Sequence, residues 1–123
     1  MTLKQITLKK DMKIYHNPRC SKSRQTLEII QQEGKDVEVI KYLEATPTAS
    51  ELREIIHLLH LEPIDLVRKN EAVWKEQFKG KTLTNDEIIE AMLAHPKLIE
   101  RPIVISNNQA IIGRPPENVR RLF

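Results

Sequence analysis

The chain has one cysteine, Cys20, and the residues around it favour a reactive thiolate. A short apolar pair leads to a turn at Asn17-Pro18, and a helical apolar pattern then runs from near Cys20 to Gly34. A thiol at the start of a helix faces free backbone N–H groups and the positive end of the helix dipole. Three cations lie beside it: Arg19, Lys22 and Arg24. Because thiolate is the nucleophile, this stretch predicts a nucleophilic cysteine next to an oxyanion site, with a buried structural cysteine as the alternative.

The position where a second cysteine of a Cys-x-x-Cys pair would stand holds Ser23. An internal dithiol cycle is therefore impossible, and any redox cycle needs a thiol from outside the chain. His16 precedes Cys20 by four residues. It either tunes the thiolate or shapes the loop through a hydrogen bond, and the residue types leave both options open.

Three arginines stand next to turns and prolines: Arg68, Arg101 and Arg114. The planar guanidinium fork suits oxyanions, although each arginine taken alone fits a solvated or ion-paired surface position better. Arg101 and Arg114 flank a predicted hairpin, so one end of a sheet can present both. Arg101-Pro102 is a candidate for a cis peptide bond at the start of a strand.

Composition indicates one globular domain. The chain has 123 residues, of which 40% are hydrophobic and 30% charged, with a formal net charge of +3. Without a long Lys/Arg run, this charge does not indicate a nucleic-acid partner, and an anionic small substrate is compatible with it. The lone cysteine excludes an internal disulfide, fits a reducing cytoplasm and predicts no metal site. Residues 1–12 are expected to be a flexible extension, neither a secretory signal nor a membrane span.

The apolar patterns predict strands and helices on both sides of a helical block. A strand–helix–strand unit with short loops, which implies a right-handed parallel pair, comes first: 13–16, 21–33 and 37–40. Capping boxes at Thr48/Glu51 and Thr84/Glu87 begin two amphipathic helices within the block, about 48–95. Residues 68–82 are read as a polar stretch with isolated apolar anchors. An antiparallel hairpin and a short C-terminal helix follow: 102–105, 110–112 and the segment after Pro115.

Several spaced motifs together resemble the glutaredoxin-coupled arsenate reductase family, from about residue 13 to the C-terminus. The first motif is His16-Asn17-Pro18-x-Cys20-x-x-Ser23-Arg24, which includes the loop Arg19-Cys20-Ser21-Lys22-Ser23-Arg24. The others are Tyr42-Leu43-Glu44, Arg68-Lys69-Asn70, His95-Pro96, Arg101-Pro102-Ile103-Val104 and Gly113-Arg114-Pro115. The resemblance implies an α/β, thioredoxin-like fold. It would be a single domain over 13–123, with a four-stranded mixed sheet and the helical block at about 48–95 as an insertion.

The resemblance also implies an activity, the reduction of arsenate to arsenite in arsenic detoxification. Cys20 would attack arsenate, and Arg68, Arg101 and Arg114 would bind the oxyanion. Supporting roles would fall to His16, Ser23, Arg24 and a cis Pro102. Glutathione would be the co-substrate and glutaredoxin the protein reductant. We expect no bound cofactor, no metal, no nucleic-acid or membrane partner, and a monomer in the cytoplasm.

One departure from the family pattern concerns the substrate. Arsenate-reducing members typically carry Cys-Gly-Thr-Ser-Arg, where this chain has Cys20-Ser21-Lys22-Ser23-Arg24, so reduction of another substrate stays open. Thiol-stress transcription regulators, which share the fold and bind RNA polymerase, are a further alternative. They commonly carry Cys-x-x-Cys and lack the arginine matching Arg114, so Ser23 and Arg114 favour the enzyme. A plain thiol-transfer protein is a third alternative, weakened by the missing second cysteine.

Overall fold

The computed structural model describes residues 11–123 of the chain. Most of the predicted extension, residues 1–10, lies outside this range. The extension was predicted to end at Met12. In the structure Met12 already belongs to the first strand, β1 (Met12–His16), which begins one residue earlier than expected. Within the described range, no helix combines the length and the apolar character that crossing a membrane requires.

Four strands form one mixed sheet in the order β2-β1-β3-β4. β1 pairs in parallel with β2 (Val37–Lys41), and α1 (Ser21–Gln32) connects the two strands. On its other side β1 pairs antiparallel with β3 (Ile103–Ser106), which forms the expected hairpin with β4 (Gln109–Ile112). This confirms the predicted fold class, a thioredoxin-like α/β fold with helices inserted between its two strand pairs.

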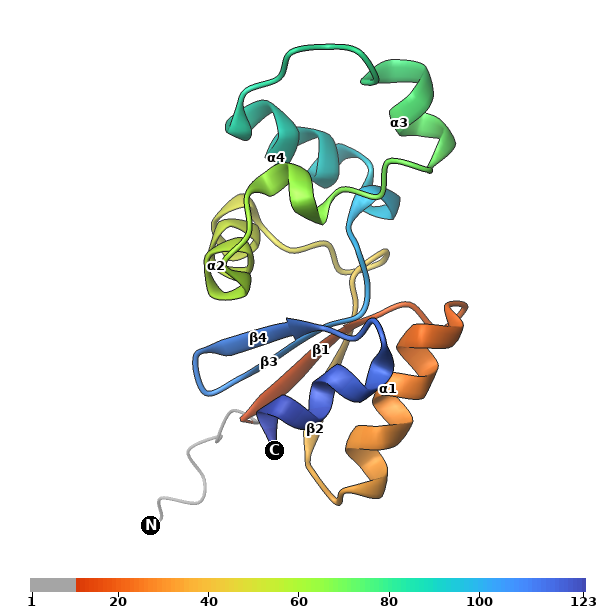
Figure 1. Cartoon of the computed structure of the whole chain (residues 1–123), viewed down its shortest axis with the longest axis vertical. Coiled ribbons are helices and arrows are strands. Elements are labelled where there is room, and N and C mark those ends of the chain that lie inside the picture. Colours follow the sequence, from red (N-terminus) through yellow and green to blue (C-terminus); the bar gives the residue numbers. More distant parts are fainter. Residues whose placement is uncertain (1–10) are drawn as a thin grey trace.

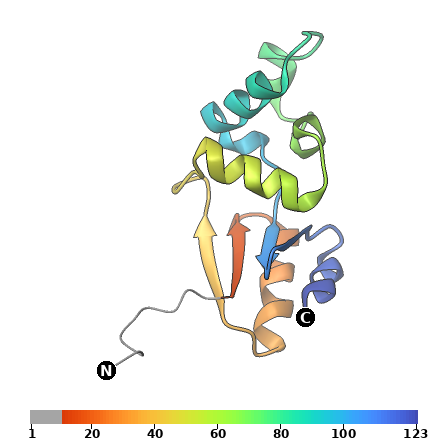
Figure 2. The same cartoon turned by 90° about the vertical axis from the view of Figure 1, so that its left-hand side faces the viewer.

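Alternating side chains of the strands divide the core between two faces of the sheet. Ile14 and Val104 pack with Ile30 of α1 and Val119 of η4 (Pro116–Leu122). Tyr15 and Ile103 face the helical block, whose α2 (Ala49–Leu59) contributes Leu52 and Ile55 to the larger core. Figures 1 and 2 show α1 and η4 side by side on one side of the sheet. The block lies beyond the ends towards which β1 and β2 point.

The helical block contains five short helices: α2, η2 (Pro63–Leu66), α3 (Ala72–Gln77), α4 (Asn85–Ala94) and η3 (Pro96–Leu98). Both predicted capping boxes are present, because Thr48 accepts from the Glu51 N–H and Thr84 accepts from the Glu87 N–H. Each satisfies two N–H groups that a helix start leaves without partners. The local sequence therefore fixes where α2 and α4 begin.

The helix α3 was not expected, because residues 68–82 read as a polar stretch. Its six residues lack a side-chain cap, and Trp74 is its one buried residue. Trp74 and Phe78 are four positions apart, and their rings stack with centroids 5.4 Å apart. That helical spacing was the available signal.

An isolated antiparallel bridge between Val67 and Ile99 joins the block to the chain that leads into β3. The Arg68 N–H donates to the Leu98 carbonyl at 2.7 Å, and the Glu100 N–H donates to the Leu66 carbonyl at 2.9 Å. This bridge places Arg68 and Glu100 side by side, next to the loop that carries Cys20.

Candidate active site

Cys20 is the N-cap residue of α1, as the sequence predicted. Its N–H donates to the Asn17 carbonyl at 3.0 Å, and its carbonyl accepts from the Arg24 N–H at 3.0 Å. The backbone of Cys20 is extended, with φ −93° and ψ 123°, and the side chain makes no capping hydrogen bond. The partly buried thiol is thus left beside the free N–H groups of the first helical turn.

The surroundings of the thiol lower the pKa of Cys20 below its ordinary value. Burial alone raises this pKa, but the backbone N–H groups of Ser23 and Lys22 and the side chain of Arg101 outweigh it. The sequence prediction credited the helix N-terminus, which is confirmed, together with the flanking cations Arg19, Lys22 and Arg24, whose side chains are not among the leading contributions. The leading contributions come from the helix N-terminus and from an arginine 81 positions away, while Arg24 turns to the Pro18 carbonyl at 3.0 Å.

His16 and Ser23 brace the loop around the thiol. Ser23 Oγ lies 2.7 Å from His16 Nδ1 and accepts from the Asn17 N–H at 3.1 Å. Burial lowers the pKa of His16, with further lowering by Lys41 and Arg24, so the imidazole is neutral at pH 7. The hydrogen bond favours the loop-shaping role for His16, one of the two that the sequence left open.

Arg114 reaches the thiol from the loop after β4. Its Nη2 lies 3.5 Å from the Cys20 sulfur, and its Nε donates to the Arg101 carbonyl at 2.8 Å. Gly113, directly before it, packs against Thr26 of α1 and against Pro102, and a Cβ on Gly113 would collide with both side chains. A glycine is therefore required for the loop to approach α1 closely enough to bring Arg114 to Cys20.

Arg101 precedes β3, and the Arg101-Pro102 peptide is cis, as expected; Arg114-Pro115 is cis as well. The Nε of Arg101 is buried without a hydrogen-bond partner, and in the described chain the other such side-chain atom is Tyr42 Oη. Burial raises the pKa of Tyr42, with opposing effects from Arg101 and Arg68 and a further rise from Cys20. The two unpartnered groups thus belong to one electrostatic cluster with the thiol.

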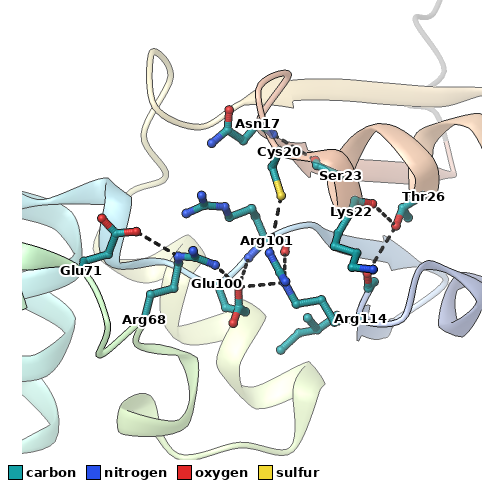
Figure 3. Close-up of polar contacts among 12 residues, drawn as sticks. Asn17, Cys20, Lys22, Ser23, Thr26, Arg68, Glu71, Glu100, Arg101 and Arg114 are labelled. Atoms are coloured by element: carbon teal, nitrogen blue, oxygen red, sulfur yellow. Dashed lines mark hydrogen bonds and ion pairs between the residues drawn. The ribbon is translucent and has the colours of Figure 1, made fainter.

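Arg68 comes from the helical block and is held by two carboxylates. It donates to Glu71 at 3.3 Å and to Glu100 at 2.8 Å. Burial lowers the pKa of Arg68, but the bonds to Glu100 and Glu71 raise it overall, so the guanidinium keeps its charge. Figure 3 shows the side chains of Arg68, Arg101 and Arg114 gathered on the side of the loop towards which the Cys20 sulfur points.

The predicted site residues thus come from three distant parts of the chain. Arg101 and Arg114 act directly on the thiol, and Arg68 joins them through Glu100. Of the residues predicted to support the site, His16, Ser23 and Arg24 form hydrogen bonds within the Cys20 loop, and Pro102 lies against Gly113. Sequence reasoning missed Glu100 and Tyr42. Tyr42 begins the motif Tyr42-Leu43-Glu44, and Glu100 directly precedes the motif that starts with Arg101-Pro102, so the available signal was proximity to these motifs.

A cavity of about 440 Å³ opens beside the Cys20 loop. Its wall includes His16 and Arg101, together with cations and carboxylates: Arg19, Lys41, Lys97, Glu44 and Glu71. Among residues 11–123, no group of three or more His, Cys, Asp or Glu side chains is placed to hold a metal ion. The arrangement can bind an anion at a nucleophilic thiol, with room for a second charged molecule alongside.

Comparison with known proteins gives a match to the ArsC family over residues 15–122. The uncharacterized protein YfgD of Escherichia coli K12 is 46% identical over 112 residues, covering 89% of this chain and 94% of the relative. An arsenate reductase of Neisseria meningitidis is 42% identical over 115 residues, covering 92% and 98%. The solved structure of an arsenate reductase from Vibrio cholerae superposes with a TM-score of 0.89 at 45% identity, covering 94% of this chain and 100% of that one.

Proposed function

Because the chain belongs to the ArsC family, we propose that it reduces arsenate to arsenite, with Cys20 as the nucleophile and thiols from outside the chain as reductants. The observation that carries the proposal is the placement of Cys20. Its pKa is lowered at a helix N-terminus, and Arg114 Nη2 lies 3.5 Å from its sulfur. A thiolate beside a guanidinium suits attack on the central atom of an anion that the same cation holds.

In the first step, the Cys20 thiolate attacks arsenic and forms an S–As bond, and one arsenate oxygen leaves as water after protonation. Arsenic stays in its pentavalent state. Negative charge on the remaining oxygens lies against Arg101 and Arg114, with Arg68 behind them. Positioned donors of this kind contribute on the order of 2–4 kcal/mol each to transition-state stabilisation.

In the second step, the thiolate of glutathione attacks the Cys20 sulfur. An S–S bond forms, the electron pair of the S–As bond passes to arsenic, and arsenite leaves. Two thiols are thereby oxidised to a mixed disulfide as arsenic is reduced. Glutaredoxin then takes the glutathionyl group and returns Cys20 to its thiol, which is needed because Ser23 cannot serve as an internal resolving thiol.

The cavity beside the loop supports a small peptide thiol as the direct reductant. Lys41 and Lys97 on its wall fit the two carboxylates of glutathione, and Glu44 fits its amino group. This chemistry fits a monomer in a reducing cytoplasm. It requires no bound cofactor.

The experiment that tests this function follows NADPH oxidation through glutathione reductase, glutathione and glutaredoxin with arsenate as substrate. We expect arsenate-dependent turnover that disappears in Cys20→Ser and when glutathione is omitted. Turnover with thioredoxin and thioredoxin reductase alone would reject the proposed reductant. The absence of turnover with either system would reject arsenate as the substrate.

The regulator alternative has its own readout, a pull-down with RNA polymerase. Ser23 and Arg114 support the enzyme over this alternative. Ser23 is engaged with His16 and Asn17, and Arg114 contacts the thiol. Retention of polymerase together with absent turnover would favour the regulator.

A further inference from the structure

We propose that Glu100 is a positioning residue of this site, whose carboxylate sets the arginines around Cys20 before any substrate arrives. For the identity of the anion, this inference rests on the proposed function. For the state of the free thiol, it stands on geometry alone.

A single oxygen of Glu100 is contacted from three parts of the chain, by two hydrogen bonds and one ion pair. Arg68 Nη1 lies 2.8 Å from Oε1, the Arg101 backbone N–H donates to it at 3.0 Å, and Arg114 Nε lies 3.1 Å from it. Figure 3 shows the carboxylate between Arg68 and Arg114. The same Arg114 Nε donates to the Arg101 carbonyl, which joins all three arginines into one network.

Glu100 is itself firmly placed. Its N–H donates to the Leu66 carbonyl through the bridge between Val67 and Ile99, and its side chain is 26% exposed. An exposed ion pair contributes little because two long side chains must be immobilised for each contact. Here the acceptor stands on a fixed backbone. One carboxylate oxygen accepts from Arg68 and from the Arg101 N–H and forms an ion pair with Arg114, so the side chains of Arg68 and Arg114 depend on the same oxygen.

The carboxylate of Glu100 also reduces the electrostatic repulsion between the arginines. Arg68 and Arg114 are like charges drawn towards one small site, and they repel each other when no anion is bound. Glu100 lies between them and offsets this repulsion. Arg114 Nη2 then remains directed at the Cys20 sulfur, and Arg101, whose side chain lowers the thiol pKa, is held through its backbone.

Two conservative variants separate the effect of the position of the Glu100 oxygen from the effect of its negative charge. Glu100→Asp keeps the negative charge but withdraws the oxygen by roughly one carbon–carbon bond, about 1.5 Å. Glu100→Gln removes the charge but keeps a carbonyl oxygen at the same reach, able to accept the same donors. If Glu100 positions the arginines, their stabilisation of the Cys20 thiolate is weakened in Glu100→Asp and retained in Glu100→Gln.

The measurement is the pKa of Cys20, read from the rate of alkylation by iodoacetamide against pH. It needs neither arsenate nor a reductant, so its outcome is independent of whether arsenate is the substrate. We expect Glu100→Asp to raise the pKa of Cys20 by about one unit, the lower end of the effect of an opposite charge within about 4–6 Å. Glu100→Gln is expected to leave the pKa equal to the wild-type value or below it.

Glu71→Asp is the matched control, since Glu71 is 25% exposed and, among residues 11–123, forms an ion pair with Arg68 alone. Its effect on the thiol pKa is expected to be smaller than that of Glu100→Asp. An unchanged pKa in Glu100→Asp with a lowered pKa in Glu100→Gln would overturn the inference, because Glu100 would then act only as a nearby anion. An unchanged pKa in both variants would overturn it too, as would equal rises in both.

Discussion

Arg114 Nη2 lies 3.5 Å from the sulfur of Cys20, although 94 positions separate the two residues along the chain. Cys20 is brought there by the start of α1, and Arg114 by the loop that leaves β4. The two meet because Gly113 packs against Thr26 on α1. The contact between nucleophile and cation is therefore a property of how a loop packs on a helix.

Gly113→Ala tests this packing. The new Cβ would collide with Thr26 and Pro102, so the loop must shift and Arg114 must move with it. We expect a loss of about 1–3 kcal/mol in the free energy of unfolding, the usual range for overpacking, together with a raised thiol pKa. Gly80→Ala is the control: its φ of +83° strains a side chain, but its Cβ meets no atom within 4 Å. It should cost stability and leave the thiol pKa unchanged.

Arg114→Lys keeps the positive charge but loses the fork that contacts Cys20, Glu100 and the Arg101 carbonyl together. We expect turnover with arsenate to fall by about 10²–10³, the effect of losing one positioned donor. Arg53→Lys is the matched control, because Arg53 forms an exposed ion pair with Asp86 in the helical block. Equal turnover in the two variants, with circular dichroism unchanged in both, would make Arg114 an ordinary surface arginine.

The pH dependence of alkylation follows from the lowered pKa of Cys20. A lowered pKa means that the thiolate is populated at a pH where a free thiol, with a pKa of about 8.5, is still mostly protonated. The rate against pH should therefore inflect below that of glutathione measured alongside. Cys20→Ser should not react at all, since the chain has no other cysteine. An inflection at or above the glutathione value would refute the electrostatic account of the thiol.

Ser23→Ala should loosen the loop. The substitution removes the partner of buried His16 Nδ1 and of the Asn17 N–H. Leaving a buried polar group unsatisfied costs about 1–3 kcal/mol, so we expect a destabilisation of that order in urea unfolding. Ser50→Ala, at an exposed position in the first turn of α2, serves as the control and should change stability far less.

Local signals explain what the sequence predicted well. Thr48 with Glu51 and Thr84 with Glu87 begin helices through contacts three residues apart, and Cys20 stands at a helix start for reasons contained in its own loop. The helix α3 lacked such a cap and went unpredicted.

The site residues that the sequence did not predict depend on contacts between distant parts of the chain. Glu100 meets Arg68 only because the bridge between Val67 and Ile99 pairs two segments that are 32 positions apart. Tyr42 is buried and interacts electrostatically with Arg101 and Arg68, which lie far from it in the sequence. The sequence predicted the effect of the helix N–H groups on the thiol pKa, but it credited the neighbouring cations with a contribution that comes from the distant Arg101.

The most direct test of the account quantifies arsenite itself. Wild-type protein is incubated with arsenate, glutathione and glutaredoxin, and the trivalent and pentavalent arsenic species are separated and counted against protein. The account predicts many arsenite molecules per wild-type chain and none above background for Cys20→Ser. Equal arsenite from wild type and Cys20→Ser, or none from either, would contradict it.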